Sequence, residues 1–330
     1  MTLVSPRKLV AVGAAAAAIA LALSACSGGG APKATTAADS GGNGNSGYKI
    51  AMITHETPGD TFWDKIRAGA EQAAKDTGVK LTYSNDPQAD KQAQLIQTAI
   101  DSKVDGIATT LVTPDALAGS VKAAQAAGIP LVGFNSGIDQ YKQLGALMYF
   151  GSDENLAGNT VGEKLAAEGV KHPLCVIQAA GSVALEARCA GVKDKVSGTE
   201  NIQVNGADDS SVVSSLQAKL AQDSSVDAIV TLGAPIAMDA LKAMSQANSK
   251  AKLVTFDLNE QAAQAIKDGK IEFSVDQQPY VQGYMAVTAL YLYIKNGNDI
   301  GGGGPVLTGP SIVDKNNIDK ILPFTKNNTR

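Results

Sequence analysis

The fold of this chain follows from one stretch, residues 50–70, which read Ile50-Ala-Met-Ile-Thr-His-Glu-Thr-Pro-Gly-Asp-Thr-Phe-Trp-Asp-Lys-Ile-Arg-Ala-Gly-Ala70. Its opening residues belong to a short apolar run from 49 to 54, which has the length of a buried strand in a parallel sheet. Pro58 and Gly59 end that strand. Asp60 is predicted to cap the helix that follows, because its carboxylate can accept hydrogen bonds from the unpaired amides of the first turn. The stretch therefore predicts a strand-loop-helix unit whose loop lies where open parallel sheets bind ligands.

Two adjacent aromatic residues, Phe62 and Trp63, open this predicted helix, and Trp63 is the only tryptophan of the chain. Phe62 shares helical spacing with Ile66 and Ala70, so these three are expected to face the sheet. Trp63 lies about 100° around the helix from that stripe. A flat aromatic ring at this place suits the C–H face of a sugar or polyol, whose hydroxyls then meet polar groups. The alternative is that both aromatics belong to the hydrophobic core.

From Tyr48 onward, short apolar runs alternate with segments of helical periodicity. Such alternation predicts parallel sheets covered by helices on both faces, with the strand-end loops on one edge. The first series is expected to have strands at 49–54, 80–84, 106–109 and 130–134 and helices at 61–77, 88–103 and 114–127. The second is expected to have helices at 155–168, 184–196, 210–222, 236–246 and 259–268 and strands at 174–179, 202–205, 228–232, 253–256 and 271–276.

Two segments repeat one plan, 121–135 and 241–257: a helix, a break, an apolar strand and a single polar residue. Internal repetition of this kind predicts two related α/β lobes, each a doubly wound parallel sheet. Asn135 and Asp257 end the equivalent strands. If the ligand-binding edges of the lobes face each other, both side chains lie in one cleft.

The first 47 residues are predicted to lie outside the folded part. Two basic residues precede an apolar run at 9–25, which closes with Leu23-Ser-Ala-Cys26 in the manner of a bacterial lipobox. Residues 1–25 are therefore predicted to be a lipoprotein signal peptide, with Cys26 as the lipidated first residue of an extracytoplasmic protein anchored to the cell membrane. A secreted protein with an incidental cysteine is the alternative. The Gly-, Ser- and Thr-rich segment 26–47 is typical of a flexible tether.

The remaining two cysteines, Cys175 and Cys189, belong to a compartment that permits disulfides. Cys175 opens a predicted strand and Cys189 lies in the helix that packs back on it, so a bridge between them is plausible; two buried free thiols are the alternative. The chain has only two histidines, His55 and His172, and they form no ligand cluster with the cysteines. Neither a metal nor a cofactor is expected.

Charge and motifs argue against several functions. The net charge of −4 gives no support for binding nucleic acid. After the leader, no apolar run reaches the roughly 20 residues that a membrane span needs. No nucleophile elbow, phosphate-binding loop or dinucleotide motif follows a predicted strand, so an enzyme is not expected.

An ordered set of motifs resembles the type I periplasmic sugar-binding proteins, the ribose- and galactose-binding group that serves ABC importers. The motifs are Ile50-Ala-Met-Ile53, Phe62-Trp63, Gly69-Ala70, Gly128-Ile-Pro-Leu-Val132, Gly151-Ser-Asp153, Glu186-Ala-Arg188, Phe256-Asp257, Asp268-Gly-Lys270 and Asp276-Gln-Gln-Pro279. The resemblance implies two lobes joined by a three-segment hinge near 149–151, near 277–279 and within 301–305. It implies an N-terminal lobe of 48–149 and 278–305 and a C-terminal lobe of 150–277 and 306–330.

The resemblance also implies roles for individual residues. Phe62 and Trp63 match the aromatic pair that sandwiches the sugar ring. Arg188 matches a donor to sugar oxygens, Asp257 a carboxylate that accepts from two hydroxyls, and Gln277 a hinge-side amide. The alternatives are a surface ion pair for Arg188, a helix cap for Asp257 and a hinge hydrogen bond for Gln277.

The chain departs from the ribose and galactose binders at two strand ends. It has Asn135-Ser136 where they carry an Asp followed by a donor, and Gly233-Ala234 where they carry Asn and Asp. A larger ligand or an acyclic polyol is one hypothesis that fits these changes. The first loop is about one residue longer than theirs, which adds three candidate ligand contacts, His55, Glu56 and Asp60.

The function expected from the sequence is an extracytoplasmic solute-binding lipoprotein that captures a simple sugar or polyol in the interlobe cleft. Its partners would be that small carbohydrate and the permease subunits of an ABC importer, and a monomer is expected. The alternative is the ligand-binding component of a sugar-sensing system with a chemoreceptor or sensor kinase. A sugar-responsive transcription regulator is disfavoured, because an export signal stands where a DNA-binding headpiece would be.

Overall fold

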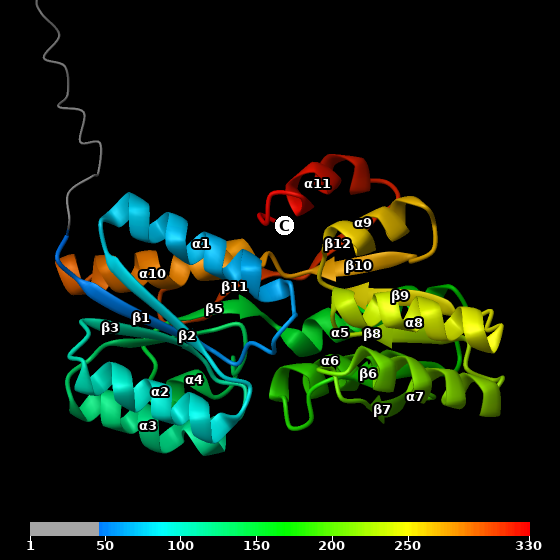
Figure 1. Cartoon of the computed structure of the whole chain (residues 1–330), viewed down its shortest axis with the longest axis horizontal. Helices are drawn as coiled ribbons and strands as arrows, with labels where there is room; N and C mark the ends of the chain where they lie inside the picture. The colour runs from blue at the N-terminus through cyan, green and yellow to red at the C-terminus, as the bar shows by residue number, and fades with distance from the viewer. Residues whose placement is uncertain (1–45) are drawn as a thin grey trace, which may run out of the picture. The chain divides into compact units, whose positions relative to one another are not determined.

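The computed structural model describes residues 46–330 (Figure 1). The signal peptide predicted at 1–25, the lipidation site predicted at Cys26 and nearly all of the predicted tether at 26–47 lie outside these residues. The described part holds two six-stranded sheets, each flanked by helices, in one compact unit. The expected pair of doubly wound lobes is therefore confirmed. No helix in residues 46–330 is both long and apolar enough to cross a membrane.

The first lobe is built on a wholly parallel sheet of order β11-β5-β4-β3-β1-β2. Its strands are β1 (Lys49–Thr54), β2 (Lys80–Asn85), β3 (Gly106–Thr110), β4 (Leu131–Phe134), β5 (Tyr149–Ser152) and β11 (Val306–Gly309). Its helices are α1 (Phe62–Thr77), α2 (Ala89–Asp101), α3 (Pro114–Ala126), α4 (Tyr141–Leu144) and α10 (Pro279–Asn296). Separate hydrophobic clusters place α1 and α10 on one face of the sheet and α2 and α3 on the other.

The second lobe repeats the plan with sheet order β12-β10-β9-β8-β6-β7, in which only β12 is antiparallel to its neighbour. Its strands are β6 (Pro173–Ile177), β7 (Glu200–Gln203), β8 (Ala228–Thr231), β9 (Lys252–Phe256), β10 (Phe273–Asp276) and β12 (Ser311–Asp314). Its helices are α5 (Glu154–Ala167), α6 (Val183–Lys195), α7 (Asp209–Gln222), α8 (Ala234–Ala247), α9 (Glu260–Lys267) and α11 (Ile318–Thr325). Helices α5 and α6 share one hydrophobic cluster, and α7 and α8 share the other.

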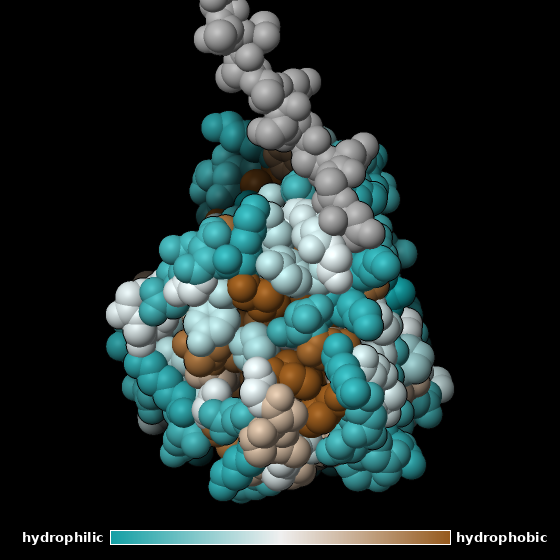
Figure 2. Space-filling model, turned by 90° about the vertical axis from the view of Figure 1, so that its left-hand side faces the viewer, coloured by the Kyte–Doolittle hydropathy of each residue, from teal (hydrophilic) through white to brown (hydrophobic). Residues whose placement is uncertain are grey.

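Glycines allow the helix pair on one face of each sheet to pack closely. A Cβ atom at Gly69 of α1 would overlap the backbone of Tyr280 in α10, and one at Gly283 would overlap the backbone of Ile66. Gly69 belongs to one of the motifs on which the resemblance rests, and this close packing gives the physical reason for a glycine there. Figure 2 shows the outer end of the first lobe, where hydrophilic residues surround smaller hydrophobic patches.

Two of the expected lobe boundaries are wrong. The first lobe continues to Ser152, because β5 pairs with β4 and β11. Residues 306–309 also belong to the first lobe instead of the second, because they form β11 beside β5. The third crossing between lobes therefore lies at Pro310, between β11 and β12, and not within 301–305. The expected return of the last strand to the second lobe is confirmed by β12.

Some local expectations also need correction. Helices α4 and α11 were not predicted. The N-cap position of α1 is Thr61 instead of Asp60, but the Thr61 side chain makes no capping hydrogen bond, whereas Asp60 Oδ1 accepts from the backbone amide of Phe62 at 3.0 Å. The strand expected at 174–179 ends at Ile177, so that Gln178 lies in the loop at the edge of the sheet.

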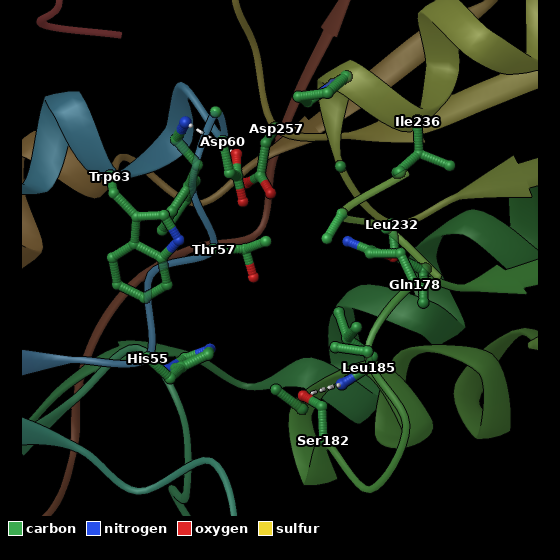
Figure 3. A pocket seen from close by; sticks show the side chains of 18 of the residues that line it. His55, Thr57, Asp60, Trp63, Gln178, Ser182, Leu185, Leu232, Ile236 and Asp257 are labelled. Carbon is green, nitrogen blue, oxygen red and sulfur yellow. Dashed lines mark hydrogen bonds between the residues drawn. The ribbon is translucent and has the colours of Figure 1, made fainter. Parts of the chain in front are cut away.

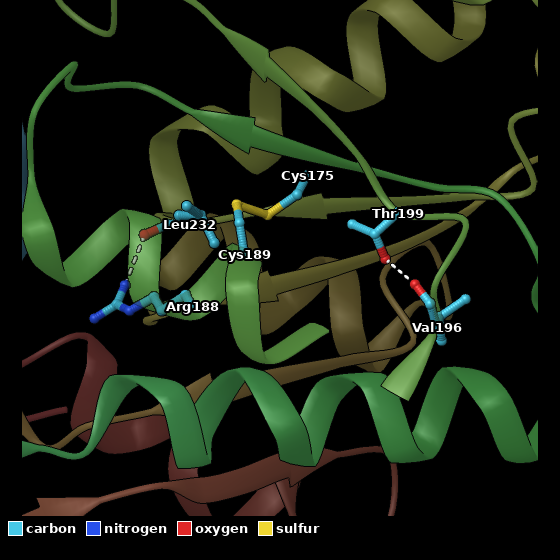
Figure 4. Close-up of a disulfide and its surroundings, with 6 residues drawn as sticks. All are labelled: Cys175, Arg188, Cys189, Val196, Thr199 and Leu232. Carbon is cyan, nitrogen blue, oxygen red and sulfur yellow. Dashed lines mark hydrogen bonds between the residues drawn. A yellow bond between two sulfur atoms is a disulfide. The ribbon is translucent and has the colours of Figure 1, made fainter. Parts of the chain in front are cut away.

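The predicted disulfide between Cys175 and Cys189 is confirmed (Figure 4). It ties β6 to α6, both cysteines are fully buried, and their Cα atoms are 5.8 Å apart. Closing a loop of this size stabilises a fold by about 3 kcal/mol in the chain-entropy model. Because Cys189 directly follows Arg188, the bridge also fixes the turn of helix that carries this arginine.

Candidate ligand-binding cleft

A cavity of about 790 Å³ lies between the carboxyl edges of the two sheets. Its volume is within the range of about 300–1,000 Å³ that is common for small-molecule sites. Residues of both lobes and of the hinge line it (Figure 3). The lining includes eight of the nine residues that the sequence singled out for the ligand, all except Glu56: His55, Asp60, Phe62, Trp63, Asn135, Arg188, Asp257 and Gln277.

Phe62 and Trp63 lie where the core of the first lobe meets the cavity. Their side chains are 7% and 3% exposed, and they belong to the hydrophobic cluster between α1 and α10. The two rings meet edge to face, with centroids 5.1 Å apart. Both residues also line the cavity, so they belong to the hydrophobic core and border the candidate ligand site at the same time.

His55 extends the aromatic wall. Its ring lies edge to face with Trp63, with 4.7 Å between centroids, and its Nδ1 is 2.8 Å from Thr110 Oγ1. Burial lowers the pKa of His55 to about 3, so the imidazole is neutral at physiological pH. Its Nε2 has no partner within residues 46–330, and the neutral ring therefore offers one hydrogen-bonding nitrogen to the cavity.

Glu56 does not face the ligand, contrary to expectation. Its carboxylate pairs with Arg67 on α1 at 3.0 Å and accepts from the hydroxyl of Tyr83 on β2 at 2.9 Å. The Arg67 guanidinium lies over the Tyr83 ring, 4.3 Å from its centroid. Glu56 therefore anchors the β1–α1 loop to α1 and β2 and does not line the cavity. The same loop carries Asp60 on the cavity side, where burial raises the pKa of its carboxyl.

Asn135 and Asp257 occupy equivalent positions, each directly after a strand. Both have a φ of +63°, in a region that Asn and Asp tolerate better than most residues. The backbone N–H of Asn135 donates to Phe150 O, and the backbone N–H of Asp257 donates to Val275 O, each at 2.9 Å. The left-handed backbone and the hydrogen bond to the next strand fix both side chains at the floor of the cavity.

Gln277 joins these two side chains across the hinge. It accepts from Asn135 Nδ2 at 3.2 Å and donates through Nε2 to Asp257 Oδ1 at 2.9 Å. Asn135 Nδ2 also donates to Gln282 Oε1 at 3.3 Å. An amide nitrogen has two hydrogens, and here both are used, so Asn135 presents its oxygen to a ligand. The floor of the cavity is therefore made mainly of acceptors.

Arg188 is the buried donor of the second lobe. It is 3% exposed, donates from Nε to Glu154 Oε2 at 2.6 Å and from Nη1 to Leu232 O at 3.0 Å. Its guanidinium lies 4.5 Å from the centroid of the Phe256 ring. Nη2 has no partner among the described residues. The alternative of a surface ion pair is wrong, because Arg188 and Glu154 form a buried one.

The carboxyl of Asp257 has a pKa close to neutral pH. Burial raises its pKa to about 7, while Arg188, whose Nη1 is 3.8 Å away, and the hydrogen bond from Gln277 act in the opposite direction. The charge of this group is therefore sensitive to anything that enters the cavity at neutral pH.

Several residues of the site were missed from the sequence: some line the cavity, and Glu154 holds the lining residue Arg188. The wall opposite the aromatic pair is aliphatic and includes Leu185, Leu232 and Ile236. Gln178 also lines the cavity, although the sequence pattern placed it inside a strand. Glu154 was missed because it lies 34 residues before Arg188, and only the packing of α5 on α6 brings the pair together. For Gln178 a signal did exist: it is a polar residue at the end of an apolar run.

Outside the cavity, one side-chain cluster in residues 46–330 has the spacing of metal ligands: His172, Glu200 and Asp223. The ammonium of Lys219 already lies among them, 2.7 Å from Glu200 and 3.1 Å from Asp223. This surface cluster is therefore a salt-bridge network of the second lobe.

Two facing α/β lobes with an aromatic and polar cleft between their carboxyl edges define the class of two-lobed solute-binding proteins. Residues 50–299 match the family model described as periplasmic binding protein domain. The chain belongs to this family, and within it to the type I sugar-binding proteins of the ribose and galactose group.

The chain is similar to several characterised proteins. A carbohydrate transporter from Acidothermus cellulolyticus 11B, solved in complex with myo-inositol, is 54% identical, with a TM-score of 0.85 over 86% of this chain and 99% of that one. The xylose/arabinose-binding protein XylF of Sulfolobus acidocaldarius is 27% identical over 75% of this chain and 66% of its own length. The ribose import binding protein RbsB of Haemophilus influenzae is 26% identical over 72% of this chain and 82% of its own length.

Proposed function

We propose that the chain is an extracytoplasmic solute-binding lipoprotein that captures a cyclitol of the myo-inositol type and delivers it to an ABC importer. The observation that carries this proposal is the placement of Trp63 and the Arg188–Asp257 pair around one cavity of small-molecule size. An aromatic ring covers a C–H face of the ligand, and the charged pair binds its hydroxyls. The similarity to a myo-inositol complex at 54% identity supports the choice of ligand.

The distribution of donors and acceptors favours a ring that carries hydroxyls all around. Asn135 and Asp257 present oxygens that accept from hydroxyls, and Arg188 Nη2 donates to hydroxyl oxygens. The side chains that would follow β8 in the ribose and galactose binders are missing at Gly233 and Ala234. A cyclitol needs no dedicated partner for a ring oxygen, because every carbon of its ring bears a hydroxyl.

The delivery role rests on the family and on the sequence of the N-terminus. Proteins of this family carry ligands to permeases, and lobe closure around the ligand creates the surface that a partner recognises. Lipidation at Cys26 would hold the binding protein at the membrane beside its permease. Replacement of Cys26 by Ser is expected to release the protein from the membrane fraction and to abolish labelling by fatty acid. Labelling that persists in this variant would contradict the lipoprotein assignment.

The ligand is tested by thermal unfolding of the purified protein with myo-inositol, scyllo-inositol, xylitol, D-ribose and D-galactose. A ligand at 100 times its dissociation constant stabilises a protein by about 2.7 kcal/mol, which is a clear shift of the melting temperature. We expect the largest shift with an inositol. A shift with D-ribose or D-galactose and none with inositols would overturn the cyclitol assignment. A cooperative melt that none of these compounds shifts would overturn carbohydrate binding as a whole.

A further inference from the structure

The amide of Gln178 points into the cavity and has no hydrogen-bond partner in residues 46–330. Figure 3 shows this side chain extending from the second lobe toward the centre of the cavity. Its Oε1 is buried and unpaired. Leaving a buried polar atom unpaired costs about 1–3 kcal/mol, which is a reason to expect such an atom to have a partner in the working state.

The position of Gln178 matches that of the two residues at the cavity floor. Gln178 directly follows β6, as Asn135 follows β4 and Asp257 follows β9. Strand β6 lies inside the second sheet, between β8 and β7. Gln178 is therefore a further polar side chain that a parallel sheet delivers to this cavity from its carboxyl edge.

Two glycines make room for the Gln178 side chain. A Cβ atom at Gly206 would lie 2.8 Å from Gln178 Cβ, and the amide of Gly206 donates to Gln178 O at 3.0 Å. A Cβ atom at Gly233 would lie 3.1 Å from Gln178 Nε2. The amide of Gln178 therefore lies beside the space into which a side chain at position 233 would extend.

We propose that Gln178 is a specificity-determining residue that replaces the side chain missing at Gly233. Its Nε2 carries two hydrogens and donates to two neighbouring ligand hydroxyls, so the amide reads a pair of adjacent hydroxyls. This assignment rests on the proposed capture of a cyclitol and names the part of the second lobe that selects it.

Selection by Gln178 has a measurable consequence. A site built to hydrogen-bond a hydroxyl rejects an analogue that lacks it, because the amide is then left buried and unpaired. The wild-type protein should therefore bind some monodeoxy-inositols much more weakly than myo-inositol. Without the amide, the penalty for one adjacent pair of hydroxyls should disappear, while the penalties at the other positions remain.

The first experiment measures binding of myo-inositol and the monodeoxy-inositols by calorimetry. Gln178→Met keeps the volume of the side chain and removes both hydrogen bonds. We expect this variant to bind myo-inositol at least about tenfold more weakly, and to bind one or two monodeoxy isomers nearly as well as it binds myo-inositol. Gln264→Met is the matched control, because Gln264 is an exposed glutamine on α9 of the same lobe; it should bind within about twofold of wild type.

A second measurement uses the contact with position 233. Gly233→Ala places a methyl group 3.1 Å from Gln178 Nε2 and should displace the amide, which weakens binding of myo-inositol. In a Gln178→Ala background the same methyl group meets no amide, and no further loss is expected. An equal loss in both backgrounds would mean that position 233 acts on the ligand directly, and it would overturn the pairing of the two positions.

The outcomes separate the two proposals. If wild-type protein binds none of the inositols, the cyclitol function fails and the role of Gln178 fails with it. If wild type binds myo-inositol and Gln178→Met binds it equally well with an unchanged pattern of deoxy analogues, only the role of Gln178 is overturned. Cooperative melting of each variant shows that it is folded.

Discussion

Each lobe places one strand-end residue at the cavity, and the two residues share a backbone conformation but differ in charge. Asn135 of the first lobe and Asp257 of the second share one φ value and one hydrogen bond to the neighbouring strand. Asn135 is then surrounded by the neutral amides of Gln277 and Gln282. Asp257 instead faces the buried guanidinium of Arg188. The repeated fold has kept the geometry of the strand end while the chemistry of the two ends has diverged.

The apolar surfaces differ in a complementary way. The first lobe contributes the aromatic rings of Phe62 and Trp63, and the second contributes the aliphatic wall that includes Leu232 and Ile236. Closure of such lobes would bring an aromatic face and a charged, aliphatic face onto opposite sides of one ring. We infer that the first lobe mainly holds the ring by its C–H face and that the second mainly reads its hydroxyls.

Replacing Asp257 by Asn makes the two strand ends chemically alike and should have the largest effect on binding. Two hydrogen bonds to a charged acceptor would be weakened, so the affinity for myo-inositol is expected to fall about 100-fold. Titration calorimetry of the purified variant measures this loss. Asn259→Asp, a change of similar size at the cap of α9, serves as the control.

The same variant has an opposite effect on the stability of the empty protein. The pKa of Asp257 is about 7 in the folded protein, above its ordinary value, so this group contributes stability that is present at low pH and is lost as the pH rises through 7. A neutral amide at this position carries no such penalty. The ligand-free Asp257→Asn variant is therefore expected to melt a few degrees higher than wild type at about pH 8 and to lose that advantage near pH 4. A lower melting temperature at pH 8 would contradict the raised pKa.

The next largest effect should come from Trp63, the aromatic residue of the first lobe. Trp63→Ala removes the face that covers the ring and is expected to weaken binding about 30-fold, together with a loss of stability because the side chain is 3% exposed. Trp63→Phe keeps an aromatic face and separates the two effects. Equal affinities of Trp63→Ala and wild type, measured on protein that melts cooperatively, would remove the aromatic wall from the site.

The position of these residues could be read from the sequence because it depends on short-range patterns. The end of an apolar run and the start of a helix place Trp63, Asn135 and Asp257 at the edge of a parallel sheet wherever the strands go. The bridge from Cys175 to Cys189 follows from one strand and the helix after it. Such features need no knowledge of how distant segments pack.

The features that were missed depend on distant packing. The pair of Glu154 with Arg188 forms only because α5 lies close to α6, where a Cβ at Gly158 or Gly191 would overlap the facing backbone. Likewise, the lobe to which β11 belongs is decided only by its ladder with β5, a strand more than 150 residues earlier in the chain. Gln178 was missed because the predicted strand extends to residue 179, whereas β6 ends at Ile177.

The dependence of binding on pH sharpens the contrast between a neutral and an acidic strand end. Ligand hydroxyls donate to ionised Asp257, so affinity should be nearly full at about pH 8 and should be about tenfold lower at about pH 6. His55 stays neutral over this range, because its pKa is about 3, and Arg188 stays charged. Two other carboxyls nearby also have a pKa raised by burial, Asp60 in the lining of the cavity and Glu154 beside Arg188. The profile of Asp257→Asn should be flat, and a slope that persists in this variant would assign the titration to Asp60 or Glu154.

Glu154 provides the smallest and most specific test of the charged lobe. Glu154→Gln keeps an acceptor for Arg188 Nε at the same distance but removes the charge, so the guanidinium stays in place and affinity is expected to fall only about threefold. Glu154→Ala leaves a buried guanidinium without its main partner and should cost about 3–5 kcal/mol of stability. If Glu154→Gln binds as weakly as Glu154→Ala, the charge itself is needed at the cleft. If it binds nearly as wild type does, Glu154 acts by holding Arg188 in position, and the second lobe reads hydroxyls through an arginine that α5 keeps aligned.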